Sequence, residues 1–265
     1  MILVALDFFM MIKRTFDRLT WFSLVAILSF YIWLGLEQKS FALPTEQILK
    51  TLQPVPVYTI TDNQGSPLFT IEPDNKNRKI TPIFLDHNDA NNFFLGIQKQ
   101  NPDLVTQAKV HLVSLAEVFR ISQLDQEKNN GFRFYYVPQE QQVKEAKKYT
   151  MDDGKPYTKG VPLFVARGIE NLGFISVQDN GESLVPMFFD LTELEHLLDR
   201  LKQEKPEIAN NLKIEVVPLE DLINTMRVKD DELLSKIVVI PSAESVKVAQ
   251  SFPSESAVSV SKSDK

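Results

Sequence analysis

Cysteine is absent from the 265 residues of this chain. The chain therefore has no disulfide, no thiolate nucleophile and no sulfur-ligated metal site, and the redox compartment stays undetermined. Glycine is scarce, with 9 residues, and neither a Gly-x-Ser-x-Gly elbow nor a phosphate-cradling glycine-rich loop occurs. Basic residues are not in excess, because the formal net charge is -6 and acids and bases are interspersed. No basic stripe exists to neutralise a phosphate backbone, so we expect no nucleic-acid partner.

The chain does hold enough apolar residues for a real core, since 43% of it is hydrophobic. Its N-terminus predicts export. Basic residues precede an apolar run at 21–36, and Ser40 and Ala42 are small residues at the two positions that a signal peptidase reads. We predict a signal peptide over residues 1–42, and a second possible start at residues 10–11 would give it a more ordinary length. The apolar run is shorter than the roughly 20 residues that span a bilayer, which disfavours the alternative of a retained membrane anchor.

An internal repeat organises the rest of the chain. Residues 81–119 can be laid on residues 185–223 without a gap. The similarity extends upstream and downstream, and each copy is predicted to run strand-strand-strand-helix-strand-helix-strand-helix. We therefore predict an α+β fold of two tandem copies, related by a pseudo-two-fold and packed as one compact body.

The predicted boundaries follow from this repeat. An N-terminal amphipathic helix occupies 43–54, the first repeat 55–150 and the second repeat 151–250. The Ser-rich tail at 251–265 has almost no large apolar side chain, and we expect it to be disordered. The segments 125–131 and 152–160 are predicted loops, the second of which is the seam between the copies.

Local signals support the individual elements. The residues Gly65 to Pro67 and the pair Asn180-Gly181 predict hairpin turns. Asn88 and Thr192 stand in equivalent places as predicted N-caps, and Thr192 would form a capping box with Glu195. Two prolines at equivalent positions predict the start of a short second helix in each copy, namely Pro102 and Pro206.

Four strings in order carry a resemblance to a known family: VPVYTITDNQGSPLF, ITPIFLDHNDANNFF followed by NPDL, KGVPLFVARG, and VPMFFDLTELEHLLDRLK. The chain resembles the Tic22-like family, the intermembrane-space component of the chloroplast inner-envelope translocon and its cyanobacterial relatives. The similarity extends from about Val55 to Val248. It implies a chaperone-like protein of the cyanobacterial periplasm or thylakoid lumen, linked to outer-membrane biogenesis. The implied partners are unfolded or partly folded preproteins and outer-membrane assembly or translocon components.

Asp86 and Asp190 are the main catalytic candidates, because one carboxylate per repeat is the arrangement of an aspartic-protease dyad. The residues that follow are neither small nor glycine, which favours a structural role at the start of a helix. The three histidines His87, His111 and His196 lack the paired spacing of a zinc helix. We therefore expect no catalytic residue, no metal and no cofactor, with a cryptic hydrolase using the two aspartates as the alternative.

Consecutive aromatic residues provide candidates for binding. In a strand they cannot all point inward, so Tyr135 and Phe189 must face either a second packed layer or solvent. If they face solvent, they would suit binding of extended or partly folded polypeptide. The predicted function is thus a chaperone-like polypeptide-binding factor that is at most peripheral to the membrane, with a membrane-anchored structural protein as a further alternative.

Overall fold

The computed structural model describes residues 42–72, 75–102, 108–128, 132–151, 154–169 and 173–252. All of them belong to one of the two units into which the chain divides, Ala42–Lys265. The predicted signal peptide and most of the Ser-rich tail lie outside the described residues. Among the described residues, no helix is long and apolar enough to cross a membrane.

The fold is a mixed α+β arrangement with two largely antiparallel sheets. The first sheet has the order β2-β3-β1-β4, and β5 adds to β3 in parallel. Its strands and the helices of the same stretch are α2 (Thr45–Leu52), β1 (Pro56–Asp62), β2 (Thr70–Glu72), β3 (Asn75–Phe84), α3 (His87–Gln100), β4 (Ala108–Ser114), α5 (Leu115–Lys128), β5 (Phe132–Val137) and α6 (Glu140–Ala146).

The second sheet repeats this pairing pattern. Its order is β11-β9-β7-β10-β6, with β8 on β9, and β11 adds to β9 in parallel as β5 does to β3. Its elements are β6 (Thr150–Met151), β7 (Pro162–Gly168), β8 (Val177–Asp179), β9 (Glu182–Phe188), α7 (Leu191–Glu204), α8 (Pro206–Ala209), β10 (Leu212–Pro218), α9 (Leu219–Val228), α10 (Glu232–Ser235), β11 (Ile237–Ile240) and α11 (Ala243–Ser251). The predicted order of strands and helices is therefore present in both halves, with β6 and α10 as elements that the sequence did not predict.

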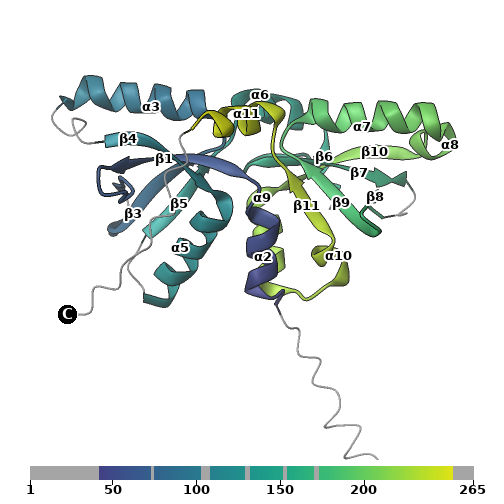
Figure 1. Ribbon diagram of the computed structural model, residues 1–265, viewed down its shortest axis with the longest axis horizontal. Helices are drawn as coiled ribbons and strands as arrows, with labels where there is room; N and C mark the ends of the chain where they lie inside the picture. Colours follow the sequence, from purple (N-terminus) through teal and green to yellow (C-terminus); the bar gives the residue numbers. More distant parts are fainter. Residues whose placement is uncertain are drawn as a thin grey trace, which may run out of the picture. The chain divides into compact units, whose positions relative to one another are not determined.

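The first strand of each sheet is buried on both faces. Residues 57–61 of β1 and 162–166 of β7 are all buried. Figure 1 shows why, since α3, α11, α6 and α7 run along one side of the sheets while α5, α2 and α9 lie on the other. Strands covered on both faces are near-continuous apolar runs, which explains the sequences of β1 and β7.

The two long helices α3 and α7 begin at aspartates. The Asp86 carboxylate accepts hydrogen bonds from the backbone N–H groups of Asn88 and Asp89, at 2.8 and 3.0 Å. The Asp190 carboxylate accepts one from Thr192 N–H at 2.9 Å. The N-caps are therefore the two aspartates, and the predicted caps Asn88 and Thr192 are wrong. Each aspartate stands two residues after its strand and still has the extended backbone that an N-cap requires.

The last helix of each half covers the sheet of the other half. On α6 of the first half, Ala146 is buried in a cluster with Phe164 of β7. On the C-terminal helix, Val248 and the following Phe252 pack against Tyr58 of β1. The aromatic contacts correspond as well, because a Tyr149 ring lies 6.2 Å from Phe164 and the Phe252 ring 5.9 Å from Tyr58. A central cluster joins the sheets, with α2 inserted into it through Ile48 and Leu52. The two halves thus share one core.

Other local predictions have mixed outcomes. The Asn180-Gly181 hairpin is confirmed, with φ of 49° and 85° between β8 and β9. The turn at Gly65 is also present, and Pro67 returns to pair with Thr61. The loop predicted from residue 125 is wrong in part, because α5 continues to Lys128.

Candidate functional site

The carboxylate pair proposed for hydrolysis serves the two helix starts. The Oδ1 atoms of Asp86 and Asp190 accept hydrogen bonds from backbone N–H groups of α3 and α7, as an N-cap requires. The two caps occupy the same place in different halves of the molecule, and each acts on its own helix. This arrangement gives both aspartates a structural role.

His87 and His196 have different surroundings. His87 packs against the rings of Tyr58 and Phe252, at 5.2 and 5.4 Å, and hydrogen-bonds the side chain of Asn91. His196 is exposed on α7, as the sequence predicted. The described residues contain no group of three or more histidines, aspartates or glutamates that could hold a metal ion.

The buried Glu215 carboxylate is paired with two cations, and burial affects the tyrosines Tyr58 and Tyr157. Glu215 is 1% exposed, and its carboxylate pairs with Lys213 at 2.6 Å and Arg167 at 3.3 Å. Burial, with the nearby Glu220 carboxylate as a smaller cause, raises the pKa of Tyr157 to about 12. Burial likewise raises the pKa of Tyr58 to about 12, with Asp86 and Glu244 adding to it. A tyrosine with a pKa this high stays protonated at neutral pH and is a poor base there.

The two candidate aromatic residues have different environments. Tyr135 lies on β5 and is 62% exposed, so it is available to a partner. Phe189 is 8% exposed and belongs to the central cluster. Of the two environments that the sequence left open, Phe189 therefore has the second packed layer and not solvent, so it is not exposed for polypeptide binding. Phe189 directly follows β9, and its N–H donates to the Ile240 carbonyl at 3.1 Å, which turns the ring into the space between the halves.

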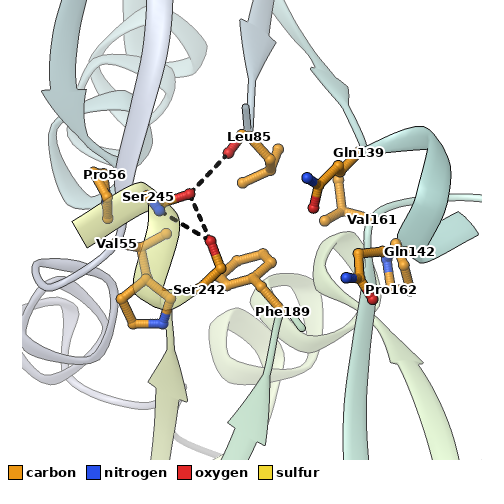
Figure 2. Close-up of a pocket in the computed structure, with 11 residues that line it drawn as sticks. Val55, Pro56, Leu85, Gln139, Gln142, Val161, Pro162, Phe189, Ser242 and Ser245 are labelled. Atoms are coloured by element: carbon orange, nitrogen blue, oxygen red, sulfur yellow. Dashed lines mark hydrogen bonds between the residues drawn. The ribbon is translucent and has the colours of Figure 1, made fainter. Parts of the chain in front are cut away.

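Phe189 lines a small cavity where the two halves meet. Figure 2 shows Val55, Leu85 and Ser245 around it, with Gln142 and Val161 across from them. The Ser245 hydroxyl donates to the Leu85 carbonyl at 3.4 Å, and Gln142 accepts from Leu191 N–H at 3.2 Å, so each exchanged helix bonds to the opposite half. The cavity measures about 20 Å³, which is room for about one water molecule. It is therefore too small to hold a peptide.

Two larger grooves could receive an apolar side chain. One of about 270 Å³ lies under the second sheet and is lined mostly by apolar side chains of β10, α9, α10 and β11, with Met151, Phe174 and Met187 beside them. Leu233 at its rim is 38% exposed. The other, of about 390 Å³, lies between β4, α11 and residues 53–56, and none of the described residues that line it is charged. Grooves with this lining bind apolar groups without an electrostatic partner.

The sequence did not indicate either groove. The lining residues come from segments that are far apart in the chain, and each alone has the pattern of an ordinary amphipathic element. Leu233, at the rim of one groove, lies on α10, which the sequence did not predict.

Comparison with known proteins shows the family of this chain. The sequence model of the Tic22-like family matches residues 24–251. This chain belongs to the Tic22-like family. The resemblance drawn from the four sequence strings is therefore confirmed.

Relatives with known sequence or structure agree with this membership. A chloroplastic TIC 22-like protein of Arabidopsis thaliana is 26% identical over 216 residues, which cover 78% of this chain and 64% of that protein. The chain thus spans less than two thirds of the length of this curated relative. The structure of Anabaena Tic22, described as a protein-transport protein, is similar with a TM-score of 0.67 and 25% identity, over 80% of this chain and 98% of that one. Tic22 from Plasmodium falciparum shares the fold, with a TM-score of 0.60, 24% identity and coverage of 77% and 96%.

Proposed function

We propose that this member of the Tic22-like family is a chaperone-like polypeptide-binding factor in protein translocation or outer-membrane biogenesis. The observation that carries the proposal is the pair of open apolar grooves of about 270 and 390 Å³. Unfolded polypeptides expose apolar side chains. A surface with apolar grooves can cover these side chains, and no catalytic step is needed. The description of Anabaena Tic22 as a protein-transport protein supports the same function here.

The proposed setting is outside the cytoplasm, in a cyanobacterial periplasm or thylakoid lumen. The N-terminal signal sequence and the chloroplastic relative support export. The proposed partners are partly folded preproteins together with outer-membrane assembly or translocon components. N-terminal sequencing of the protein from fractionated cells tests this setting, since cleavage after Ala42 is expected. An intact start in the membrane fraction would favour an anchored protein instead.

The proposal also holds that the protein is not an enzyme. The capping roles of Asp86 and Asp190 support this, because a carboxylate that holds helix N–H groups is not placed to share a proton with a second one. The grooves contain one ionisable side chain, Asp221, among the residues that line them. Binding then depends on apolar burial, and its affinity should change little with salt.

We further propose that the halves are tandem copies related by a pseudo-two-fold. The matched strand pairings support this, with Tyr58 opposite Phe84 in one sheet and Phe164 opposite Phe188 in the other. Matching hydrogen bonds in the two halves support it too. Leu115 N–H donates to the Val55 carbonyl, and Leu219 N–H donates to the Val161 carbonyl, both at 2.8 Å. Superposition of residues 55–146 on 161–249 tests the relation, and a rotation far from 180° would contradict it.

An aggregation assay tests the polypeptide-binding function. An unfolded outer-membrane β-barrel protein is diluted from urea, with and without the full chain, and light scattering is followed at low and high salt. We expect the wild-type chain to delay aggregation at both salt concentrations. Leu233→Asp should shorten the delay because it puts a charge at the rim of the 270 Å³ groove.

The matched control is Ile208→Asp. Ile208 is 42% exposed on α8 and lines neither groove, so the same charge is added at the same exposure. This variant should delay aggregation as well as the wild type does. Tyr135→Ser is expected to weaken client binding without lowering the thermal midpoint, because its ring is exposed. A wild-type chain that causes no delay would contradict the proposed function.

A further inference from the structure

The outer strands β4 and β10 hold the same position in the two sheets. Each pairs antiparallel with the first strand of its half, with Leu112 opposite Tyr58 and Val216 opposite Phe164. The outer edge of β10 is covered, because β6 pairs with it in parallel and places Met151 opposite Val216. In the part of the chain that the structure describes, β4 pairs with β1 alone. Among the described residues, one sheet therefore has an occupied edge where the other has an open one.

The segment that covers β10 is the chain that follows α6. After β6 it turns back, and Met151 N–H donates to the Lys155 carbonyl at 2.7 Å. Tyr157 then enters the cluster formed with Ala146 and Val216, where its ring is 4% exposed. Its hydroxyl donates to the Gly160 carbonyl at 2.5 Å. As a result, Ala146 and Val216 are both 0% exposed.

The corresponding place beside β4 is the groove of about 390 Å³. Leu112 and Ala249 line it, and they hold the positions that Val216 and Ala146 hold in the other half. Both are only partly buried, which is the difference expected when the strand and the tyrosine are absent. The groove thus combines an apolar slot with a strand edge whose backbone groups can pair.

We propose that β4 accepts an extended segment of a partner polypeptide as an added parallel strand, with a large apolar side chain seated against Leu112 and Ala249. The inference rests on the proposed polypeptide-binding function and names where the client binds. Strand addition supplies main-chain hydrogen bonds for affinity, and the adjoining groove selects apolar side chains. No charged side chain is among the described residues that line the groove, so binding there does not require an ionic contact.

The chain's own tail is a poorer occupant by composition. Residues 253–265 contain Ala257, Val258 and Val260 as their hydrophobic residues, and no aromatic residue, leucine, isoleucine or methionine. They therefore offer no counterpart to Met151 or Tyr157, the two side chains that fill the matching space in the other half. We therefore assign the large apolar group to a partner and not to the tail.

Peptide binding to the full chain tests the site. The probe is a fluorescent peptide that copies residues 148–158, the segment that covers β10. We expect saturable binding, with slower hydrogen exchange of the β4 amides in the complex. N-methylation of alternate peptide amides should abolish binding, because it removes the donors of an added strand.

Variants on α11 separate the groove from the rest of the surface. Ala249→Trp fills the groove and should weaken peptide binding by at least about tenfold, and Gln250→Trp at its exposed rim should weaken it in the same direction. Lys247→Trp is the control, since Lys247 is exposed on the same helix and does not line the groove. It should bind as the wild type does, and all three thermal midpoints should be unchanged.

The outcomes distinguish the site from the function. If the wild type delays aggregation but binds no peptide, or if both groove variants bind the peptide normally, the β4 site is overturned and the proposed function stands. If the wild type does not delay aggregation, the proposed function itself fails. If deletion of residues 253–265 strengthens peptide binding by about tenfold, the tail occupies the groove and the commitment to a partner is overturned.

Discussion

Two aspartates control how α3 and α7 begin, and they show how a residue that looks catalytic can be structural. An Asp→Asn change keeps an oxygen that can accept from the same backbone N–H groups, whereas Asp→Ala removes it. We expect Asp86→Ala and Asp190→Ala each to lower the free energy of unfolding by about 1 kcal/mol, and the two Asn variants to lower it by less. Urea unfolding followed by circular dichroism measures the difference.

Combining the two Asn substitutions addresses the hydrolase alternative. The double change Asp86→Asn with Asp190→Asn should leave client binding and the delay of aggregation unchanged. If that pair of substitutions abolished an activity while the protein stayed as stable as the wild type, the carboxylates would have a chemical role and the capping explanation would be incomplete.

Two buried tyrosines have hydroxyls in opposite situations. The Tyr58 hydroxyl is buried with no hydrogen-bond partner in the described structure, and Phe164 holds the matching position in the other sheet. The Tyr157 hydroxyl donates to Gly160. Tyr58→Phe should therefore raise the free energy of unfolding by about 1 kcal/mol, and Tyr157→Phe should lower it by a similar amount. Thermal unfolding measures whether each variant gains or loses stability. A loss of stability in Tyr58→Phe would show that the Tyr58 hydroxyl has a hydrogen-bond partner.

At the scale of elements, the exchange of α6 and α11 is the feature that joins the two halves. Each sheet obtains one covering helix from the other half, and Gln142 and Ser245 add a hydrogen bond in each direction. A half expressed alone would expose the apolar face that its missing helix covers, since Phe164 or Tyr58 would lose its neighbours. Small single sheets with an uncovered face are marginal in water.

We expect residues 42–150 and 151–252, produced separately, to show no cooperative unfolding and to recover native circular dichroism when mixed. The control is the full chain cut at a protease site placed at residues 152–153, which should stay folded and elute as one particle in size-exclusion chromatography. A cooperative thermal transition in either isolated half would mean that the exchanged helix is dispensable.

At the scale of the whole molecule, buried tyrosines predict how stability depends on pH. Burial raises the pKa values of Tyr58, Tyr136 and Tyr157 to about 12, above the ordinary value of 10.0. The folded state therefore keeps these protons at a pH where the unfolded chain releases them. Their contribution to stability is fully present below pH 10 and is lost as the pH rises through about 12.

We expect the free energy of unfolding to fall between pH 10 and about 12, with the Tyr58→Phe protein falling less steeply. Urea titrations at several alkaline pH values, with tyrosinate absorbance read in parallel, provide the measurement. Identical slopes for wild type and Tyr58→Phe would show that Tyr58 ionises in the folded protein as it does in the unfolded one.

The sequence by itself determined what depends on short-range rules. The order of strands and helices, the turn at Asn180-Gly181 and the exclusion of sulfur chemistry follow from periodicity, backbone preference and composition. Family membership also followed from the order of four strings. The exact helix caps did not, because Asp86 and Asn88 have similar capping ability and the strand end decides between them.

Only the tertiary structure decided what depends on contacts between distant segments. A pair of adjacent aromatic residues in the sequence gives no sign of which layer covers it, and so the sequence left both solvent and a second packed layer open for Phe189, which lies in the core. The exchange of α6 and α11, the pairing of β6 with β10 and the open groove beside β4 all join residues from separate parts of the chain. Burial is a property of the assembled layers, because a side chain loses solvent only when another element covers it.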